Sequence, residues 1–333
     1  MDEIGIIVVS WHDAADLYEA IASLGKARSA VPAGGPRTRL TVVVNGGDAS
    51  RGEIEARWPG ARVVVNAHNR GYAAAANQGA AQTPSNYLLF LNPDARAEGD
   101  PFTAIARGFR ERPSAAALAP RLLDADSDRA GAGESARLAP PGAENQFTFQ
   151  LRALPTLASD ARELLLLDHL FPNNPARRRA RYADRDPEAP LPVAQAAAAA
   201  LAVRADAFRG IGGFAEDFTP AWFEDVDLCA RLAAVGEILY WPSARFRHRG
   251  GAASARLGYA TFLPLYYLNA LRYRRRRYGP AARAAYRALL PAGMLLRLAA
   301  LPFRRSDPRP KRESARAYLS VLRVALGLSP RAR

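Results

Sequence analysis

The sequence predicts an α/β protein with a mostly parallel sheet flanked by helices, followed by a basic helical extension at the C-terminus. Three observations predict this arrangement. Short apolar runs alternate with helical segments through residues 4–120. Of the 333 residues, 49% are hydrophobic, which is enough for a sizeable core. Arginines are concentrated in residues 260–333, where the pattern is helical.

The predicted strands are short runs of apolar and mostly β-branched residues. They lie at residues 4–10, 40–45, 61–65, 87–91 and 115–120, with a helix over residues 72–81. Continuous apolar strands separated by helices are typical of a parallel sheet that is covered on both faces. Such sheets bind ligands beyond the carboxyl ends of their strands. Four polar side chains at or just past these ends predict a polar rim: Ser10, Asn45, Asn66 and Asn92.

Residues 124–192 lack a regular pattern, because Pro, Arg and acidic residues interrupt them outside one apolar stretch at residues 163–171. We expect an insertion with one short helix there. Regular patterns return from residue 193, including a helix over residues 222–232 and a strand at residues 238–242. The prediction is a domain of residues 1–259, interrupted by the insertion, and a helical extension of residues 260–333.

The net charge of +14 belongs to that extension. Residues 260–333 hold 16 Arg, one Lys and two acidic residues, a net charge of +15, which leaves −1 for residues 1–259. A basic segment of this kind suits an anionic membrane surface or a nucleic acid. Within it, residues 288–303 are apolar but contain Pro291 and Arg297, which favours an interfacial position over a bilayer span.

Cysteine usage and the N-terminal residues favour a cytoplasmic protein. The single cysteine, Cys229, excludes an internal disulfide and suits a reducing compartment. The N-terminal residues begin acidic and lack the basic start and cleavage site of a signal peptide, so we expect them to form the first strand. Motifs for dinucleotide binding, for P-loop nucleotide binding, for a nucleophile elbow and for zinc are absent from the sequence.

Two acidic clusters are candidates for chemistry. In the first, Asn92-Pro93-Asp94 follows a predicted buried strand, where a carboxylate and an amide can hold Mg²⁺ or Mn²⁺ against a substrate phosphate. The same triplet is also a common turn sequence. His248 can ligate a cation or contact a phosphate, although an isolated histidine is more often structural.

In the second cluster, Glu224, Asp225 and Asp227 lie in the first turn of a predicted helix, directly after Trp222-Phe223. Acidic residues at this end of a helix are stabilised by its dipole, which explains one or two of them without any function. Apolar walls next to a carboxylate raise its pKa and make it a usable base.

Taken together and in order, six segments resemble the inverting glycosyltransferases of family 2, which have the GT-A fold, and in particular their bacterial rhamnosyltransferase-like branch. The segments span residues 8–254: VVSWH, VVVNGGDAS, NRGYAAAANQG, LLFLNPDA, GGFAEDFTPAWFEDVDLCARL and HRGGAAS. The third and fifth are individually quite specific, whereas the first is weak.

The resemblance implies a role for each candidate residue. The implied nucleotide-sugar contacts are Ser10, Trp11, Asn45, Asn69, Arg70, Gly71, Asn77, Asn92 and Asp94. Asp94 and His248 are the implied metal ligands, for Mg²⁺ or Mn²⁺. Glu224 and Asp225 form the implied catalytic pair, with Asp225 as the base. On the acceptor side, the implied residues are Trp222, Phe223 and Asp227.

The sequence departs from the family pattern in two places. Val44-Asn45 stands where the family usually has Asp-Asn, which weakens an acidic contact to the nucleotide base. The metal motif is reduced to Asn-Pro-Asp, which leaves one carboxylate, Asp94, for the ion.

The implied reaction is metal-dependent, inverting transfer of a sugar, rhamnose by resemblance, from a nucleoside diphosphate to a hydroxyl group of a glycan or lipid-linked acceptor. It would serve cell-wall or polysaccharide synthesis at the inner face of the membrane, which the extension would contact. A second hypothesis is an inactive member of the family that acts as a binding or scaffold subunit. A third, nucleic-acid binding through the arginine-rich extension, is the least favoured, and we expect no nucleic-acid partner. The sequence does not indicate an oligomeric state.

Overall fold

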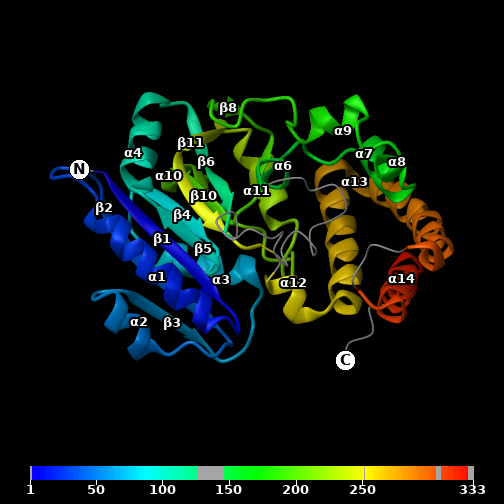
Figure 1. Ribbon diagram of the computed structural model, residues 1–333, viewed down its shortest axis with the longest axis horizontal. Helices are drawn as coiled ribbons and strands as arrows, with labels where there is room; N and C mark the ends of the chain where they lie inside the picture. The colour runs from blue at the N-terminus through cyan, green and yellow to red at the C-terminus, as the bar shows by residue number, and fades with distance from the viewer. Residues whose placement is uncertain (1, 126–145, 251, 305–308, 329–333) are drawn as a thin grey trace. The chain divides into compact units, whose positions relative to one another are not determined.

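The computed structural model describes residues 2–125, 146–250, 252–304 and 309–328. Contacts within the chain divide it into two compact units (Figure 1). The first comprises Met1–Asp128, Asn145–Ala153 and Tyr182–Arg249. The second comprises Arg129–Glu144, Leu154–Arg181 and Gly250–Arg333. Every candidate site residue named above belongs to the first unit.

A mixed sheet forms the centre of the first unit, with nine strands in the described residues (Figure 1). The strands are β1 (Glu3–Ser10), β2 (Arg37–Asn45), β3 (Arg62–Asn66), β4 (Tyr87–Leu91), β5 (Ala95–Glu98), β6 (Ala115–Asp124), β8 (Leu191–Pro192), β10 (Ala200–Arg204) and β11 (Glu237–His248). Their order is β3-β2-β1-β4-β10-β6-β11-β5, and β8 pairs with β11. The predicted fold class, a mostly parallel sheet flanked by helices, is confirmed.

The parallel part of the sheet has β1 at the point where the strand order reverses. β2 lies on one side of β1 and β4 on the other, and both run parallel to it, with Val8 paired to Val42 and to Leu91. Strand order therefore reverses at β1, and a crevice is expected beyond the carboxyl ends of β1 and β4. On the far side of β4, the antiparallel β10 separates it from β6, so the sheet is mixed there.

Apolar residues cover both faces of the sheet. One face carries α1 (Ala14–Ser29), α2 (Arg51–Arg57) and α4 (Pro101–Glu111), which bury residues such as Leu17, Ile54 and Phe102. The opposite face carries α3 (Tyr72–Ala81), α6 (Gln146–Gln150), α10 (Ala205–Gly210) and α11 (Glu224–Leu232). Each large apolar side chain buried in this way contributes roughly 1.5–3 kcal/mol. This burial fixes the two helices, α3 and α11, that carry candidate site residues.

The second unit is helical. It contains α7 (Leu157–Leu164), α8 (Leu167–Leu170), α9 (Pro175–Ala180), α12 (Ala252–Leu257), α13 (Tyr259–Ala300), the 3₁₀ turn η1 (Leu301–Phe303) and α14 (Lys311–Ala325). The long α13 is interrupted at Gly279, which has a φ of 88°, before Pro280. It packs against α14 and α7. The predicted helical character of the C-terminal region is confirmed, whereas the stretch after residue 154 forms three helices and not the single one expected.

A buried ion pair joins α7 to α13 in this unit. Arg274 Nε donates a hydrogen bond of 2.8 Å to Asp160 Oδ2, and Arg274 Nη2 forms a short contact with Oδ1. The guanidinium also lies 4.1 Å from the ring centroid of Tyr286. Both charged side chains are buried, so neither can lose its partner without leaving an uncompensated charge in the interior.

Candidate active site

The loop after β1 is fixed by an internal hydrogen-bond pair. Ser10 is fully buried, and its hydroxyl forms a short hydrogen bond with Asp13, which also accepts a 3.1 Å bond from the backbone N–H of Trp11. The Trp11 ring stays partly exposed and meets the His12 ring edge-on, with centroids 5.3 Å apart. Ser10 therefore shapes the loop, while Trp11 presents an aromatic surface to solvent.

Asn45 is the organising residue of the loop after β3. Its Nδ2 donates to Asn69 Oδ1 at 2.9 Å and to the carbonyl of Gly71 at 3.3 Å. Its Oδ1 accepts from Asn66 Nδ2 at 3.0 Å and from the backbone N–H of Arg70 at 3.1 Å. Because Asn45 is 2% exposed and its amide makes four hydrogen bonds within the protein, it positions Asn69 and Arg70, both exposed, and is not itself presented to a ligand.

The same loop is fastened to the segment that precedes α11. The backbone N–H of Tyr72 donates to the carbonyl of Pro220 at 2.7 Å. Gly71 has a φ of 84°, and a Cβ there would lie 3.2 Å from the Pro220 oxygen, so glycine fits the position best. One turn further along α3, Asn77 Nδ2 donates to the carbonyl of Phe214 at 2.9 Å. Asn77 therefore holds α3 to a neighbouring loop.

Asp94 and His248 come together at the carboxyl end of β4, as a metal site requires. His248 Nε2 lies 3.3 Å from Asp94 Oδ1 and 3.4 Å from the side-chain nitrogen of Asn92. Both Asp94 and His248 are buried. His248 reaches this position as the last residue of β11, whose end pairs with β5 directly after the Asn92–Asp94 turn.

The charge of the Asp94 carboxylate is favoured by its surroundings. Burial alone would raise its pKa, but the hydrogen bond and charge of His248, together with the charge of Arg249, lower it below its usual value. Asp94 is therefore an anion throughout the physiological range. An ionised carboxylate is the form that binds a divalent cation.

These residues fit a divalent cation with two protein side-chain ligands. Adjacent ligands of an octahedral Mg²⁺ lie about 3 Å apart, close to the separation of Asp94 Oδ1 and His248 Nε2. On the other side of the ring, His248 Nδ1 lies 3.5 Å from Gln146 Oε1, a contact that would orient the ring if Nε2 exchanged its proton for an ion. No group of three or more His, Cys, Asp or Glu ligands occurs in the described residues. The remaining positions on an ion would fall to a substrate and water.

The Trp222–Asp225 segment has a strained backbone. Trp222 and Phe223 have φ angles of 74° and 73°, in the left-handed region that bulky side chains rarely adopt. Each such residue costs of order 1–3 kcal/mol and persists where the surroundings enforce it, frequently at functional sites. The strained pair leads directly into Glu224, the first residue of α11. The backbone of Trp222 and Phe223 thereby sets the direction in which α11, and with it Glu224 and Asp225, begins.

The two carboxyl groups of this pair have different environments. Asp225 is partly exposed and accepts hydrogen bonds from the backbone N–H groups of Val226, at 2.8 Å, and Ala198. Glu224 is buried, and its Oε2 has no hydrogen-bond partner in the described part of the chain. Partial burial raises the pKa of Asp225, and nearly complete burial together with the charge of Asp225 raises the pKa of Glu224 well above its usual value. Because the pKa of Glu224 is raised more than that of Asp225, the pair favours an ionised Asp225 beside a protonated Glu224.

The third acid of the cluster has a structural environment. Asp227 is 3% exposed and accepts a 2.7 Å hydrogen bond from Arg231 Nε one turn along α11. Arg231 also donates to the backbone carbonyl of Ile211 at 2.9 Å. The Asp227–Arg231 pair thus anchors α11 and leaves Asp225 as the acid with access to a ligand.

The metal candidate and the acidic pair flank the same short segment. The backbone N–H of Asn92 donates to the carbonyl of Ala199 at 3.0 Å. The preceding residue, Ala198, donates to the Asp225 carboxylate. Asp94 and Asp225 are 131 positions apart in the sequence. The segment Ala198–Ala199, which precedes β10, contacts both the turn that contains Asp94 and the carboxylate of Asp225.

Two side chains near Asp225 were not singled out from the sequence. Tyr72 is close enough for the charges of Glu224 and Asp225, together with burial, to raise its pKa, so its hydroxyl stays protonated. It lies inside the NRGYAAAANQG segment, where the pattern drew attention to Asn69 and Arg70. Arg152 lowers the pKa of Asp225 through its charge. It lies in a region without a regular pattern, so no motif pointed to it.

Comparisons with known proteins identify relatives by sequence. The sequence profile described as "Glycosyl transferase family 2" matches residues 5–155. Two curated proteins of Mycobacterium tuberculosis, from strains CDC 1551 / Oshkosh and ATCC 25618 / H37Rv, are each 27% identical over 212 residues. Both are named N-acetylglucosaminyl-diphospho-decaprenol L-rhamnosyltransferase. Each match covers 60% of this chain and 62% of the relative, so the chain spans less than two thirds of those proteins.

Solved structures share the fold. GalNAc-T7, crystallised with UDP, GalNAc and Mn²⁺, has a TM-score of 0.52 at 12% identity, covering 81% of this chain and 48% of the other. Staphylococcus aureus TarS has a TM-score of 0.51 at 13% identity, covering 98% of this chain and 49% of the other. At these identities the likeness concerns the fold alone.

Proposed function

We propose that the chain is a family 2 glycosyltransferase, which its GT-A fold and its sequence relatives support. It would transfer a sugar from a nucleoside diphosphate to a hydroxyl group of a lipid-linked glycan, with inversion. The observation that carries this proposal is that two adjacent residues contact both sides of the site: Ala199 accepts the N–H of Asn92, two residues before Asp94, and Ala198 donates to the Asp225 carboxylate. L-rhamnose is the proposed sugar, after the names of the curated relatives.

On the donor side, the exposed Arg70 and the partly exposed Trp11 are the proposed contacts of the nucleotide. Arg70 offers a planar set of donors for phosphate or base, and Trp11 offers an apolar ring face. Asp94 and His248 are the proposed ligands of Mn²⁺ or Mg²⁺. When bound, such an ion supplies positive charge that stabilises the departing diphosphate. GalNAc-T7, which has the same fold, was crystallised with UDP and Mn²⁺.

On the acceptor side, Asp225 takes the proton of the attacking hydroxyl at its carboxylate as the new glycosidic bond forms. The bonds from Val226 and Ala198 hold the carboxylate in place. Its raised pKa makes Asp225 a stronger base than an exposed aspartate. Glu224, kept protonated next to it by burial and by the charge of Asp225, adds no second negative charge to the site. Attack from the side opposite the leaving group inverts the anomeric carbon.

A thermal-shift panel of nucleoside diphosphate sugars with and without Mn²⁺ tests the donor side. A ligand that binds only the folded state raises its apparent stability, so the correct donor should raise the Tm most, and only with the metal present. Radiolabelled transfer from that donor to a lipid-linked N-acetylglucosamine acceptor tests the reaction. A donor that binds without transfer to any glycan would instead support an inactive binding subunit.

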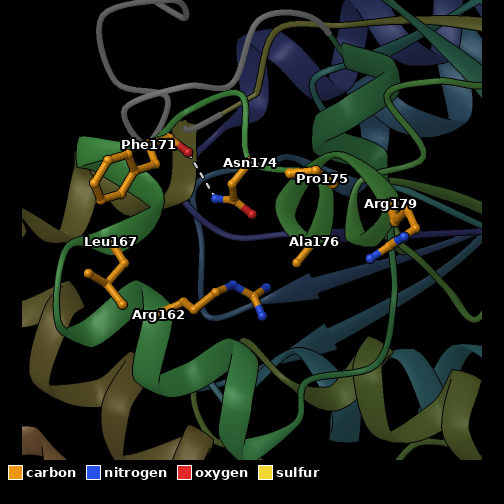
Figure 2. Close-up of a pocket in the computed structure, with 7 residues that line it drawn as sticks. All are labelled: Arg162, Leu167, Phe171, Asn174, Pro175, Ala176 and Arg179. Atoms are coloured by element: carbon orange, nitrogen blue, oxygen red, sulfur yellow. Dashed lines mark hydrogen bonds between the residues drawn. The ribbon is translucent and has the colours of Figure 1, made fainter.

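We also propose that the second unit contacts an anionic membrane. Of the thirteen large exposed hydrophobic side chains in the described residues, eleven belong to this unit. Within residues 162–179 an open hollow of about 470 Å³ is lined mostly by apolar atoms, and the guanidinium groups of Arg162 and Arg179 point toward it (Figure 2). Phe171, which lines this hollow, and the adjacent Leu170 are 62% and 64% exposed. Exposed apolar side chains beside arginines suit acyl chains and phosphate head groups.

The length and composition of α13 are relevant to the proposed membrane contact. Tyr259–Phe303 is the helical stretch within the described ranges that is long and apolar enough, by length and composition, to cross a bilayer. Three prolines lie inside its α13 part, the helix breaks at Gly279, and Tyr286, Leu290 and Met294 are buried within the protein. We propose peripheral contact over insertion of this stretch, because residues buried against protein are not presented to lipid.

Flotation with liposomes containing anionic lipid tests the contact. The wild-type protein should float, and the double variant Leu170→Ser/Phe171→Ser should float several-fold less, because both side chains are exposed and removal of their apolar area weakens partitioning. Val65→Ser, at a residue of the first unit that is 57% exposed, is the matched control. Failure of the wild-type protein to float, or equal flotation of all three proteins, would exclude the proposed contact.

A further inference from the structure

Arg152 has an unusual environment for an arginine. It is the last residue of β7 (Leu151–Arg152), only partly exposed, with its guanidinium carbon 5.4 Å from the ring centroid of Phe149. Its Nε is shielded from solvent and lacks a hydrogen-bond partner among the described residues. A buried donor without a partner costs roughly 1–3 kcal/mol. A group that would satisfy it is therefore expected in a bound state of the protein.

The fold holds Arg152 beside the acidic pair. β7 pairs with β9 (Gln195–Ala196), with Arg152 opposite Gln195. The chain continues from β9 into Ala198, whose N–H holds the Asp225 carboxylate. Arg152 is thus one strand away from the segment that fixes Asp225.

Arg152 and Asp225 influence each other without forming an ion pair. The charge of Arg152 is among the factors that lower the pKa of Asp225 against the effect of burial. Yet no ion pair joins the two side chains in the described residues. In contrast, the guanidiniums of Arg249 and Arg231 contact Asp16 and Asp227 directly. The positive charge of Arg152 is therefore not neutralised by a direct carboxylate contact.

We propose that Arg152 binds a phosphate group of the acceptor substrate and so selects acceptors whose sugar is linked through phosphate. This inference rests on the proposed function. A guanidinium presents paired donors that match phosphate oxygens, and charge-assisted bonds of this kind are strong. The acceptor is favoured over the donor as the source of the phosphate, because Arg152 pairs with Gln195 of β9, which leads into the residue that holds Asp225, the proposed base. Asp94, the proposed donor-side residue, is influenced by His248 and Arg249 instead.

The test compares two soluble acceptors that differ only in the phosphate. One is N-acetylglucosamine joined to a short alkyl chain through a diphosphate, and the other is the same sugar joined directly to the chain. For Arg152→Gln we expect the KM for the diphosphate acceptor to rise about 10- to 100-fold, corresponding to loss of charge-assisted hydrogen bonds. The KM for the neutral acceptor should change less than twofold. Arg152→Lys, which keeps the charge, should lie between.

Donor measurements on the same proteins distinguish the source of the phosphate. The donor KM and the acceptor-independent hydrolysis of the donor should be unchanged in Arg152→Gln. A raised donor KM with an unchanged acceptor KM would overturn the inference, because Arg152 would then bind the donor diphosphate. Equal losses for both acceptors would also overturn it and would indicate that Arg152 is only a counter-ion of Asp225.

Arg107→Gln, at an exposed arginine of α4, is the matched control for removing one positive charge, and it should behave as wild type. The Tm of each variant shows whether it is folded. Absence of transfer by the wild-type protein to either acceptor would refute the proposed function. Transfer by the wild-type protein with no acceptor discrimination would refute the inference alone.

Discussion

Replacement of Asp225 by Asn should abolish transfer and at the same time stabilise the protein. The substitution keeps the shape of the side chain and one oxygen for the N–H groups of Val226 and Ala198, but removes the proposed base. General-base catalysis contributes about 10²- to 10⁴-fold, so kcat should fall by that factor, equivalent to roughly 3–5 kcal/mol in the barrier. Donor binding should persist, because the donor-side residues are unchanged.

The stability gain follows from the sign of the pKa shift. Burial raises the pKa of Asp225 in the folded state, so the folded protein binds this proton more tightly than the unfolded chain. The contribution of Asp225 to stability is therefore present at low pH and is lost as the pH rises from the ordinary aspartate pKa through the raised one. The amide introduced by Asp225→Asn does not ionise, so the stability of the variant would not fall as the pH rises through this range. Engineered changes that relieve such a cost commonly gain about 0.5–2 kcal/mol.

Urea unfolding and transfer kinetics, measured from pH 5 to pH 8, check both parts. For the wild-type protein, kcat should rise with pH through the raised pKa of Asp225. The stability advantage of Asp225→Asn should narrow as the pH falls. Asp206→Asn, the same change at an exposed residue of α10, is the control and should alter neither quantity. A variant that retains more than a tenth of wild-type activity would refute the role of Asp225, and a loss of stability at pH 8 would refute the electrostatic argument.

Three further predictions concern other parts of the molecule. Asp94→Asn should remove the Mn²⁺-dependent rise in Tm that the donor gives, and it should raise the free-energy barrier to transfer by several kcal/mol. A variant whose Tm still responds to the metal would exclude Asp94 as a ligand. Arg274→Met should destabilise the protein by about 3–5 kcal/mol in urea unfolding, because Asp160 would remain buried without its partner, and Arg274→Met/Asp160→Leu should recover most of that loss. Gly71→Ala should lower the free energy of unfolding by roughly 1–3 kcal/mol, because the φ at this position is 84° and a Cβ would crowd the Pro220 carbonyl. It should also raise the donor KM. An unchanged Tm would contradict this prediction.

The sequence was sufficient to predict the parallel half of the sheet, because every strand there is rich in apolar residues and reads as a nearly continuous apolar run. β4 is an example, with all five residues buried. It could not predict that β10 enters antiparallel between β4 and β6, because a buried strand has the same composition in either direction. The short β5 was missed for another reason: its sequence, ARAE, is only partly buried and lacks an apolar run.

At the candidate site, the sequence predicted which residues gather there better than it predicted the role of each one. The pattern indicated Asp94, Asp225 and His248, and the structure brings Asp94 and His248 into contact. It could not distinguish residues that face a ligand from residues that hold those residues in place. Asn45 is an example, because its four internal hydrogen bonds depend on loops more than 20 positions away. Arg152 is the opposite case, a residue whose position depends on the pairing of two two-residue strands.

The missing acid after β2 now has a structural explanation. Val44 is 2% exposed and belongs to the apolar cluster that includes Leu17 and Ile54, so a carboxylate at this position would be buried among hydrocarbon side chains. With the amide of Asn45 fully used inside the protein, neither residue at the end of β2 is free to contact a base. Recognition of the nucleotide is then expected to depend on Trp11 and Arg70, which are at least partly exposed at the same edge. Stacking and a charge-assisted contact distinguish bases weakly, so tolerance of more than one nucleotide is the expected consequence.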